Sequence, residues 1–267
     1  MIIFANAKIN LGLFILKKRK DGYHEISSLK FPIPLCDVIE ILPSEHFELK
    51  ILGTPIDGDM QDNLIYKAYS ILKEKNSIDP VRIVLQKNIP MGAGVGGGSA
   101  DATFTLMGLN DYFNLNLSKE TLKGYAAQLG SDCPFFVDTK PQLASGKGDE
   151  LVEFELSLKG KFLYLIHPNI HISTAEAYAN VEPMSSSFEW ECLKQKDFMF
   201  WKENLANDFE KSIFPNHPEI EGLKLELYEN GAQYASMSGS GSSVFGIFDE
   251  RPKELFPEFK TQFILAL

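Results

Sequence analysis

Cysteine, positive charge and long hydrophobic runs are all scarce in this sequence. Cys36, Cys133 and Cys192 are odd in number and far apart, so they predict no disulfide framework. No apolar run approaches the roughly 20 residues of a membrane-spanning helix. The apolar start, Met1 to Ala5, is followed at once by polar residues, whereas a secretory signal places its charge before about 7–15 apolar residues. We therefore expect a reduced, cytoplasmic protein with no membrane partner.

Acidic residues outnumber basic ones. The chain of 267 residues has 26 Lys and Arg against 36 Asp and Glu, a net charge of −10. Duplex nucleic acid and anionic membranes attract a cationic face, so the composition predicts neither as a partner. Apolar residues make up 44% of the chain, which is ordinary for globular proteins and argues against disorder. The length suits one large domain or two ordinary ones.

Hydrophobic periodicity predicts strands and helices without regular alternation. Strands are expected at 8–16, 26–31, 37–42, 47–52, 81–86, 142–145, 150–154, 162–167, 232–236 and 243–248. Helices are expected at 63–75 with Asp62 as its cap, at 98–111, from Ser118 to Gly130, at 173–181 and at 219–230, with a polar loop at 184–187. This pattern predicts an α+β fold, with a first domain at 1–157 and a second at 158–267.

The strongest chemical signal is the glycine-rich segment Pro90–Asp101, PMGAGVGGGSAD. Five glycines fall within seven residues, and each would cost about 1 kcal/mol against Ala inside a helix. Without Cβ atoms the backbone N–H groups stay uncovered, and at a helix start they join the positive end of the helix dipole. The natural ligand is a chain of phosphates, and Ser99 could add a hydroxyl to phosphate or to Mg²⁺. The helical pattern after the glycines disfavours a flexible surface loop.

Two familiar phosphate-binding patterns fit this segment poorly. Gly92 and Gly97 have the Walker spacing, but Gly98 stands where that pattern needs Lys. The dinucleotide pattern is formally present, yet residues 87–91 separate the expected strand from the glycines. A second helix is also expected where a dinucleotide fold needs a second strand. These departures disfavour a dinucleotide-dependent enzyme.

The glycine-rich segment resembles the central ATP loop of the GHMP kinases, which include homoserine, mevalonate and galactose kinases. Two more motifs occur in the same order: Ala7–Leu11, AKINL, resembles the early lysine motif, and Met237–Ser243, MSGSGSS, resembles the carboxy-terminal glycine loop. The resemblance implies ATP and Mg²⁺ as cofactors. It also implies a fold of two domains, with ATP and substrate in the cleft between them. The first domain would be similar to the second domain of a ribosomal protein, and the second would be ferredoxin-like.

Two other segments resemble one branch of these kinases. Arg19–His24, RKDGYH, is similar to an R-x-D-G-Y-H segment, and Gly130–Phe136, GSDCPFF, is similar to a G-S-D-x-P-F-F segment. The branch acts in the non-mevalonate route to isoprenoid precursors, where it phosphorylates the 2-hydroxyl of a cytidine diphosphate-linked methylerythritol. Val95 stands where Leu is usual, and residues 182–202 match no segment of the family pattern. The role of 182–202 is therefore left open.

Lys8 and Asp132 are the candidate catalytic residues. Asp132 follows an expected helix end and precedes Pro134, which stops further helix. A loop carboxylate can accept the proton of a hydroxyl, and the resemblance makes Asp132 the catalytic base, although a helix-terminating Asp would look the same. Lys8 lies among apolar residues, and a buried Lys needs a partner. It is predicted to pair with Asp132 and to stabilise phosphoryl charge; a surface Lys on an edge strand is the alternative.

The other candidate residues would bind the two substrates. Tyr23 could stack on a cytosine and His24 could read its polar edge, although both could be ordinary turn residues. The resemblance implies that Asn10 hydrogen-bonds the substrate. Thr174 and Tyr178 share a helix face and resemble the residues that close the nucleobase pocket; Phe is usual at position 178, and core packing is the alternative there. The residues assigned to ATP are Asn63, Pro90, Met91, Gly92, Ala93, Gly94, Val95, Gly96, Gly97, Gly98, Ser99 and Ala100.

Several functions remain open at this point. A sister kinase acting on homoserine or mevalonate is one, a non-catalytic nucleotide sensor is a second, and a hydride-transferring dehydrogenase is a third. The sequence does not identify the residues around adenine or the Mg²⁺ ligands, apart from the hydroxyl of Ser99, and it allows a monomer or a homodimer. His167 and His171 lack Cys or carboxylate partners at ligand spacing, so no zinc site is predicted.

Overall fold

The computed structural model describes residues 1–56, 58–183 and 188–267. The polar loop expected at 184–187 lies outside the described residues. The chain divides into two compact units, each built from separate stretches. Unit 1 comprises Met1–Ala7, Leu35–Met91 and Gly96–Lys140; unit 2 comprises Lys8–Pro34, Gly92–Val95 and Pro141–Leu267. The division between residues 157 and 158 stays a prediction.

Two long strands, β1 (Ile2–Lys18) and β2 (His24–Pro43), each contribute to both units. The sequence predicted two short strands in place of β2, which was wrong. The break was expected around Pro32 and Pro34, because proline donates no ladder hydrogen bond. In the structure both prolines lie between the part of β2 that pairs with β5 and the part that pairs with β4, so the strand continues through them.

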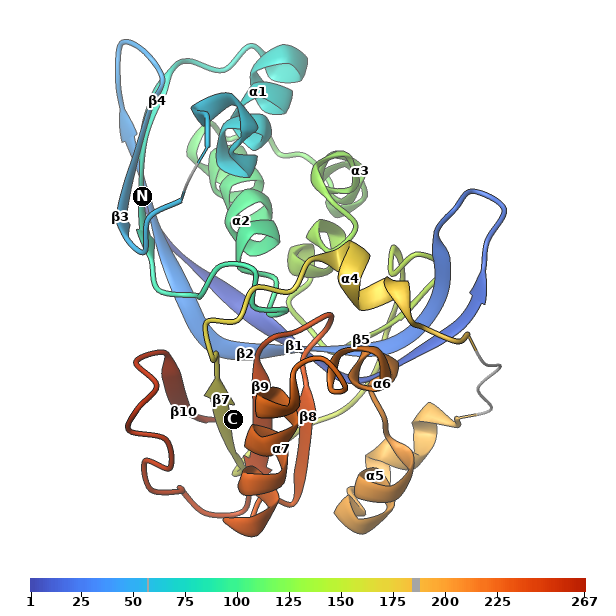
Figure 1. The fold of residues 1–267 in the computed structure, drawn as a ribbon. Coiled ribbons are helices and arrows are strands. Elements are labelled where there is room, and N and C mark those ends of the chain that lie inside the picture. The colour runs from blue at the N-terminus through green and yellow to red at the C-terminus, as the bar shows by residue number, and fades with distance from the viewer. Residues whose placement is uncertain (57, 184–187) are drawn as a thin grey trace. The chain divides into compact units, whose positions relative to one another are not determined.

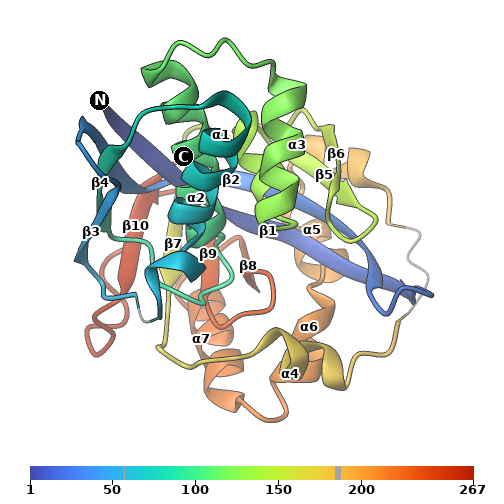
Figure 2. The same cartoon turned by 90° about the horizontal axis from the view of Figure 1, so that it is seen from above.

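Unit 1 places helices beside a small sheet. Its strands β3 (Glu48–Gly53) and β4 (Val81–Lys87) pair in parallel, and β4 pairs antiparallel with residues 38–43 of β2. The helices are α1 (Leu64–Asn76), α2 (Gly97–Tyr112) and α3 (Lys119–Leu129), with short 3-10 helices at η1 (Met60–Asp62) and η2 (Cys133–Val137). Helices α1 and α2 pack side by side (Figures 1 and 2). Every second residue of β4 is buried, and the last of these buried residues is Lys87.

Helix α1 begins one residue later than the sequence predicted. Asp62 was expected to cap it, but the chain first makes the 3-10 turn of η1, which ends at Asp62. The side-chain oxygen of Asn63 then accepts a hydrogen bond of 2.9 Å from the backbone N–H of Ile65. Asn and Asp cap helices about equally well, so local propensity did not distinguish the two positions.

Unit 2 contains a four-stranded antiparallel sheet in the order β10-β7-β9-β8. Its strands are β7 (Phe162–Ile166), β8 (Tyr234–Met237), β9 (Val244–Phe248) and β10 (Gln262–Ala266), and a hairpin of β5 (Gln142–Ser145) and β6 (Glu150–Glu153) pairs with β2. The helical segments are α4 (Thr174–Ala179), η3 (Trp190–Gln195), α5 (Phe198–Asn204), α6 (Asp208–Ile213) and α7 (Pro218–Glu229). Helix α7 lies against β8 and β9 (Figure 1), where Leu223 and Leu227 join Tyr164 and Ile166 in the core.

The helices predicted at 98–111, 118–130, 173–181 and 219–230 correspond to α2, α3, α4 and α7, with ends shifted by one or two residues. Such shifts are ordinary at helix ends. None of the helices in the described part of the chain is long and apolar enough to cross a membrane.

Candidate active site

The glycine loop, Pro90–Asp101, has the backbone that its composition predicts. Gly92, Gly94 and Gly96 have φ angles of +61°, +74° and +75°, in the left-handed region that residues with a Cβ rarely adopt. Helix α2 starts at Gly97 without a side-chain cap. The first N–H groups of a helix have no partner within it, so this end can receive an anion. The loop therefore fits a nucleotide phosphate.

In unit 2 the segment Gly92–Val95 of the glycine loop packs against the carboxy-terminal glycine motif, Met237–Ser243. The hydroxyl of Ser238 donates a hydrogen bond of 3.0 Å to the Gly94 carbonyl. A Cβ atom at Gly94 would lie 2.0 Å from the Ser238 carbonyl oxygen and 3.0 Å from that of Gly241. These two motifs, distant in sequence, are thus brought together through the missing side chain of Gly94.

Gly94→Ala is expected to destabilise unit 2 by about 1–3 kcal/mol, the usual cost of forcing extra atoms into a packed site. The left-handed backbone adds strain to that collision. The free energy of unfolding, measured by urea titration, checks this. Gly124→Ala is the control, because a Cβ at this exposed position of α3 meets no atom of the described residues within 4 Å. Equal stability of the two variants would contradict the described packing.

Lys8 and Asn10 lie in the same part of unit 2. Lys8 is 3% exposed, and its ammonium donates hydrogen bonds of 2.6 Å to Asn10 Oδ1 and 2.9 Å to the Gly94 carbonyl. The backbone N–H of Lys8 donates to the Val95 carbonyl at 3.0 Å. The Asn10 amide donates to the Ser28 hydroxyl at 2.8 Å. The structure thus brings Lys8 and Asn10 together with the glycine loop, and Lys8 is not a surface lysine.

Asn207 is a residue of this site that the sequence analysis missed. It is 1% exposed, and its amide donates hydrogen bonds of 2.8 Å to the carbonyls of Met237 and Gly239. Its side-chain oxygen caps α6 by accepting from Phe209. Asn207 therefore fixes the start of the carboxy-terminal glycine motif. In the sequence, Asn207 is recognisable only as an Asn that precedes a short helix. Any helix N-cap gives the same signal, so it does not indicate a role in the site.

Asp132 belongs to unit 1, in the turn between α3 and η2. The backbone N–H of Phe135 donates to its carbonyl at 3.3 Å, and that of Cys133 donates to Gly130 at 3.2 Å. The Thr103 hydroxyl of α2 lies 2.9 Å from the carbonyls of both Ser99 and Cys133. The turn of Asp132 is thus fixed to the first turns of α2. Because Lys8 lies in unit 2, the pairing of Lys8 with Asp132 stays a prediction.

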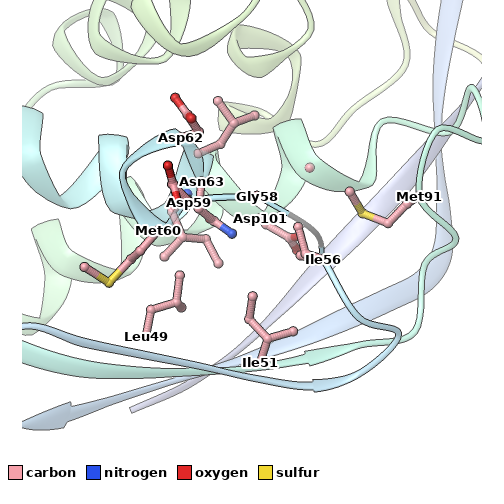
Figure 3. A pocket seen from close by; sticks show the side chains of 13 residues that line it. Leu49, Ile51, Ile56, Gly58, Asp59, Met60, Asp62, Asn63, Met91 and Asp101 are labelled. Carbon is pink, nitrogen blue, oxygen red and sulfur yellow. The ribbon is translucent and has the colours of Figure 1, made fainter. Parts of the chain in front are cut away.

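A cavity of about 330 Å³ opens in unit 1 beside the starts of α1 and α2. Figure 3 shows Leu49 and Ile51 projecting into it from β3, with Met60 and Asn63 facing them. Its lining residues are Leu49, Ile51, Ile56, Gly58, Asp59, Met60, Asp62, Asn63, Leu64, Ile65, Met91, Gly98 and Asp101. Of these, the sequence analysis proposed Asn63, Met91 and Gly98. The apolar members have no sequence signal that separates them from core residues.

Asp101 is a buried acid at this cavity. It is 3% exposed, and burial raises the pKa of its carboxyl to about 7, because a low-dielectric environment disfavours the charged form. Among the described residues, its Oδ1 atom has no hydrogen-bond partner. Within the described residues, no three His, Cys, Asp or Glu side chains gather where they could hold a metal ion.

Aromatic residues proposed to recognise a base come together in unit 2. The rings of His24 and Tyr178 stack, with centroids 4.7 Å apart and planes 14° apart, and Phe209 packs edge-on against Tyr178. Tyr23 is 60% exposed, with the Lys147 ammonium 5.0 Å from its ring centroid. Thr174 is the exposed first residue of α4, four residues before Tyr178.

Comparison with known proteins identifies the family to which this chain is similar. The model of the GHMP kinases N terminal domain matches residues 63–139, and that of the GHMP kinases C terminal domain matches residues 191–264. The 4-diphosphocytidyl-2-C-methyl-D-erythritol kinase of Bacteroides fragilis strain YCH46 is 46% identical over 267 residues, covering 98% of this chain and 97% of its own.

Solved structures agree. A crystal structure of 4-(cytidine 5'-diphospho)-2C-methyl-D-erythritol kinase has a TM-score of 0.81 at 31% identity, covering 92% of this chain and 90% of its own. The mevalonate kinase of Methanococcus jannaschii has a TM-score of 0.69 at 16% identity, covering 100% and 98%, and so shares the fold. These matches confirm the resemblance and the two-domain α+β fold. The chain belongs to the GHMP kinase family, within its group of 4-diphosphocytidyl-2-C-methyl-D-erythritol kinases.

Proposed function

We propose that the protein transfers the γ-phosphoryl group of ATP to the 2-hydroxyl of 4-diphosphocytidyl-2-C-methyl-D-erythritol, a step towards isoprenoid precursors. Family membership supports this substrate. The observation that carries the chemistry is the buried ammonium of Lys8, bonded to the Gly94 carbonyl in the glycine loop. Phosphoryl transfer depends mainly on positioning and on stabilising charge at the moving phosphoryl group, and a fixed cation beside a phosphate loop suits both.

The ATP would be held by the glycine loop and the cavity of unit 1. Uncovered N–H groups at the start of α2 suit the phosphates. The apolar side chains of Leu49, Ile51 and Met60 suit a flat purine, and Asn63 supplies a polar group beside them. A mainly apolar cavity of at least about 300 Å³ with a few polar groups is typical of small-molecule sites. The Ser99 hydroxyl would hold Mg²⁺, which usually binds few protein groups and would supply positive charge to offset the negative charge of the phosphates.

The acceptor step would use Asp132 and Lys8. The Asp132 carboxylate accepts the proton of the 2-hydroxyl while that oxygen forms a bond to the γ-phosphorus. The bond from phosphorus to the β–γ bridging oxygen breaks, and ADP leaves with that electron pair. Lys8 stabilises the negative charge of the transferring group. No phosphoenzyme is needed, because the acceptor oxygen takes the phosphoryl group directly.

Residues of unit 2 would bind the cytidine part of the substrate. His24 and Tyr178 stack on each other, and Tyr23 adds an exposed aromatic face. Aromatic faces of this kind suit stacking on a base. A neutral imidazole has one donor and one acceptor, which suits the polar edge of cytosine. Thr174 would close the site from α4, and Asn10 would contact the methylerythritol part.

His24 predicts a pH dependence of substrate binding. Burial, aided by nearby Lys18, lowers the pKa of the imidazole below its ordinary value of 6.5, so the ring is mainly neutral at pH 7. Protonation turns its acceptor nitrogen into a donor. The KM for the cytidylyl substrate should therefore rise as the pH falls below 6.5. In His24→Gln, which keeps a donor and an acceptor but does not titrate, this rise should disappear.

A competition assay tests the proposed function. Homoserine, mevalonate and the cytidylyl substrate are offered together with labelled ATP, and we expect label only in the cytidylyl product. Label in either other compound would make the protein a sister kinase. ATP binding without transfer to any of the three would favour a nucleotide sensor, and thermal stabilisation by NAD but not by ATP, CDP or CTP would favour a dehydrogenase.

We also propose that the enzyme works in the cytoplasm as a monomer or homodimer. Few and widely spaced cysteines support a reducing compartment, and the net charge of −10 gives no attraction to nucleic acid or anionic membrane. Light scattering in solution separates the monomer from the dimer.

A further inference from the structure

A buried ion cluster lies beneath the glycine loop in unit 1. The Lys87 ammonium is 2.8 Å from Asp101 Oδ2 and also contacts Asp37 Oδ2, and the side chains of Lys87, Asp37 and Asp101 are 0%, 0% and 4% exposed. We call these three residues the stem cluster. None of them has a role in the catalytic steps described above.

The stem cluster is bonded to both ends of the glycine loop. On the entering side, Asp37 Oδ1 accepts hydrogen bonds from the backbone N–H groups of Asn88, at 2.6 Å, and Ile89, at 2.8 Å. On the leaving side, Asp101 lies near the start of α2 and holds the Lys87 ammonium. One ammonium thus joins the two stems, 87–89 and 97–101, through charge-assisted bonds, the stronger class of hydrogen bond.

Gly97 makes room for this arrangement. A Cβ atom at Gly97 would lie 2.9 Å from Lys87 Nζ and 2.8 Å from Ile89 Cγ2, whereas one at the neighbouring Gly98 would meet nothing closer than Leu64 at 3.8 Å. The φ angle of Gly97 is not in the left-handed region. A side chain at Gly97 would therefore collide with Ile89 and with the Lys87 ammonium, although the backbone angle itself does not require glycine.

Stability alone gives little reason for such a cluster. Replacing a buried ion pair by well-packed apolar residues is often neutral or stabilising, because desolvation offsets the attraction between the charges. What ionic bonds add here is a fixed geometry: they join β2, the end of β4 and the start of α2 at one point. The start of α2, which these bonds fix in place, also contains the uncovered backbone N–H groups proposed to bind phosphate.

We propose that Asp37, Lys87 and Asp101 are positioning residues for ATP, which hold the two stems of the glycine loop at the spacing that phosphate binding requires. The proposal rests on the proposed function, since it assumes that the loop binds ATP. The stem cluster itself touches no reacting atom and acts through the backbone of the loop.

Two variants separate positioning from stability. Lys87→Met leaves the Asp37 and Asp101 carboxylates without the ammonium between them, so both thermal stability and ATP binding should fall. The KM for ATP should rise at least about tenfold. Lys87→Met combined with Asp101→Asn removes one of those carboxylates. Thermal stability should then recover in part, while the KM for ATP stays high because the stems are no longer joined. The KM for the cytidylyl substrate should change less than twofold.

Leu72→Ala provides the control for a purely structural loss. Leu72 is a fully buried residue of α1 outside the stem cluster, and its truncation should lower the melting temperature with an unchanged KM for ATP. A KM for ATP that recovers with stability in the double variant would overturn the positioning role. Direct titration with ATP distinguishes the two proposals: variants that bind ATP as tightly as the wild type overturn the positioning role alone, and a wild type that binds none overturns both.

Discussion

Asp132→Asn is expected to lower kcat by about 10²–10⁴, the range usual for a general base. The substitution keeps the size and shape of the side chain but cannot accept the proton of the attacking hydroxyl. The turn should persist, because the bonds from Cys133 to Gly130 and from Phe135 to the Asp132 carbonyl use backbone atoms. The KM values should change little, since the lost interaction belongs to the transition state. Steady-state kinetics with both substrates varied measures these quantities.

Asp138→Asn is the matched control for that experiment. Asp138 directly follows η2 and forms ion pairs with Lys119, at 2.9 Å, and with Lys123, at 2.5 Å, on the surface of unit 1. Surface pairs contribute at most about 1 kcal/mol, so this variant should keep its kcat. Near-normal turnover in Asp132→Asn would remove Asp132 from the role of base.

A second substitution at the same position separates proton transfer from orientation. Asn can still hydrogen-bond the acceptor hydroxyl, whereas Ala cannot. Phosphoryl transfer passes through a loose transition state in most analyses, so orienting the nucleophile could matter more than deprotonating it. If Asp132→Ala is much slower than Asp132→Asn, orientation carries most of the effect; equal rates would assign it to proton removal.

The fold was largely predictable where a local pattern decides the structure. The glycines of the loop, the Ser118 cap and the alternation in β4 are properties of a few neighbouring residues, and the structure reproduces them. The interrupted strand predicted in place of β2 was wrong because pairing with strands distant in sequence determines whether a strand continues. Pro32 and Pro34 look like a strand break, yet β2 continues because neither needs to donate to β4 or β5.

The site was predictable to the extent that its residues carry distinctive chemistry. Lys8 and Asn10 were predicted, and the structure brings them to the glycine loop, while their roles stay predictions. The apolar cavity was not, because Leu49 and Ile51 alternate on β3 as any half-buried pair would. Asn207 was missed for a related reason: its two bonds to the carboxy-terminal glycine motif span 30 and 32 residues, and no local pattern encodes such a contact.

Lys8→Met is expected to lower kcat by about 10²–10³, the loss that follows removal of one electrostatic group from a transition state. Met has a similar length and is apolar, so it can occupy the buried path of the lysine. It leaves the Gly94 carbonyl and Asn10 Oδ1 without the ammonium donor. Lys8→Arg should not restore the rate, because its planar guanidinium does not replace a compact ammonium in a site only 3% exposed.

Lys30→Met offers a control of the same chemistry in the same unit. Lys30 is 1% exposed, and its ammonium donates a hydrogen bond of 2.8 Å to the carbonyl of another glycine, Gly148. Lys30→Met removes a donor to the Gly148 carbonyl, and Lys8→Met removes one of two donors to the Gly94 carbonyl, which keeps its bond from Ser238. Losing such a hydrogen bond costs about 0.5–1.5 kcal/mol of stability, and of these two bonds the one from Lys8 reaches the glycine loop. The free energy of unfolding should therefore fall similarly in both, while kcat falls only in Lys8→Met. Equal losses of kcat would mean that Lys8 supports the fold and not the transferring phosphoryl group.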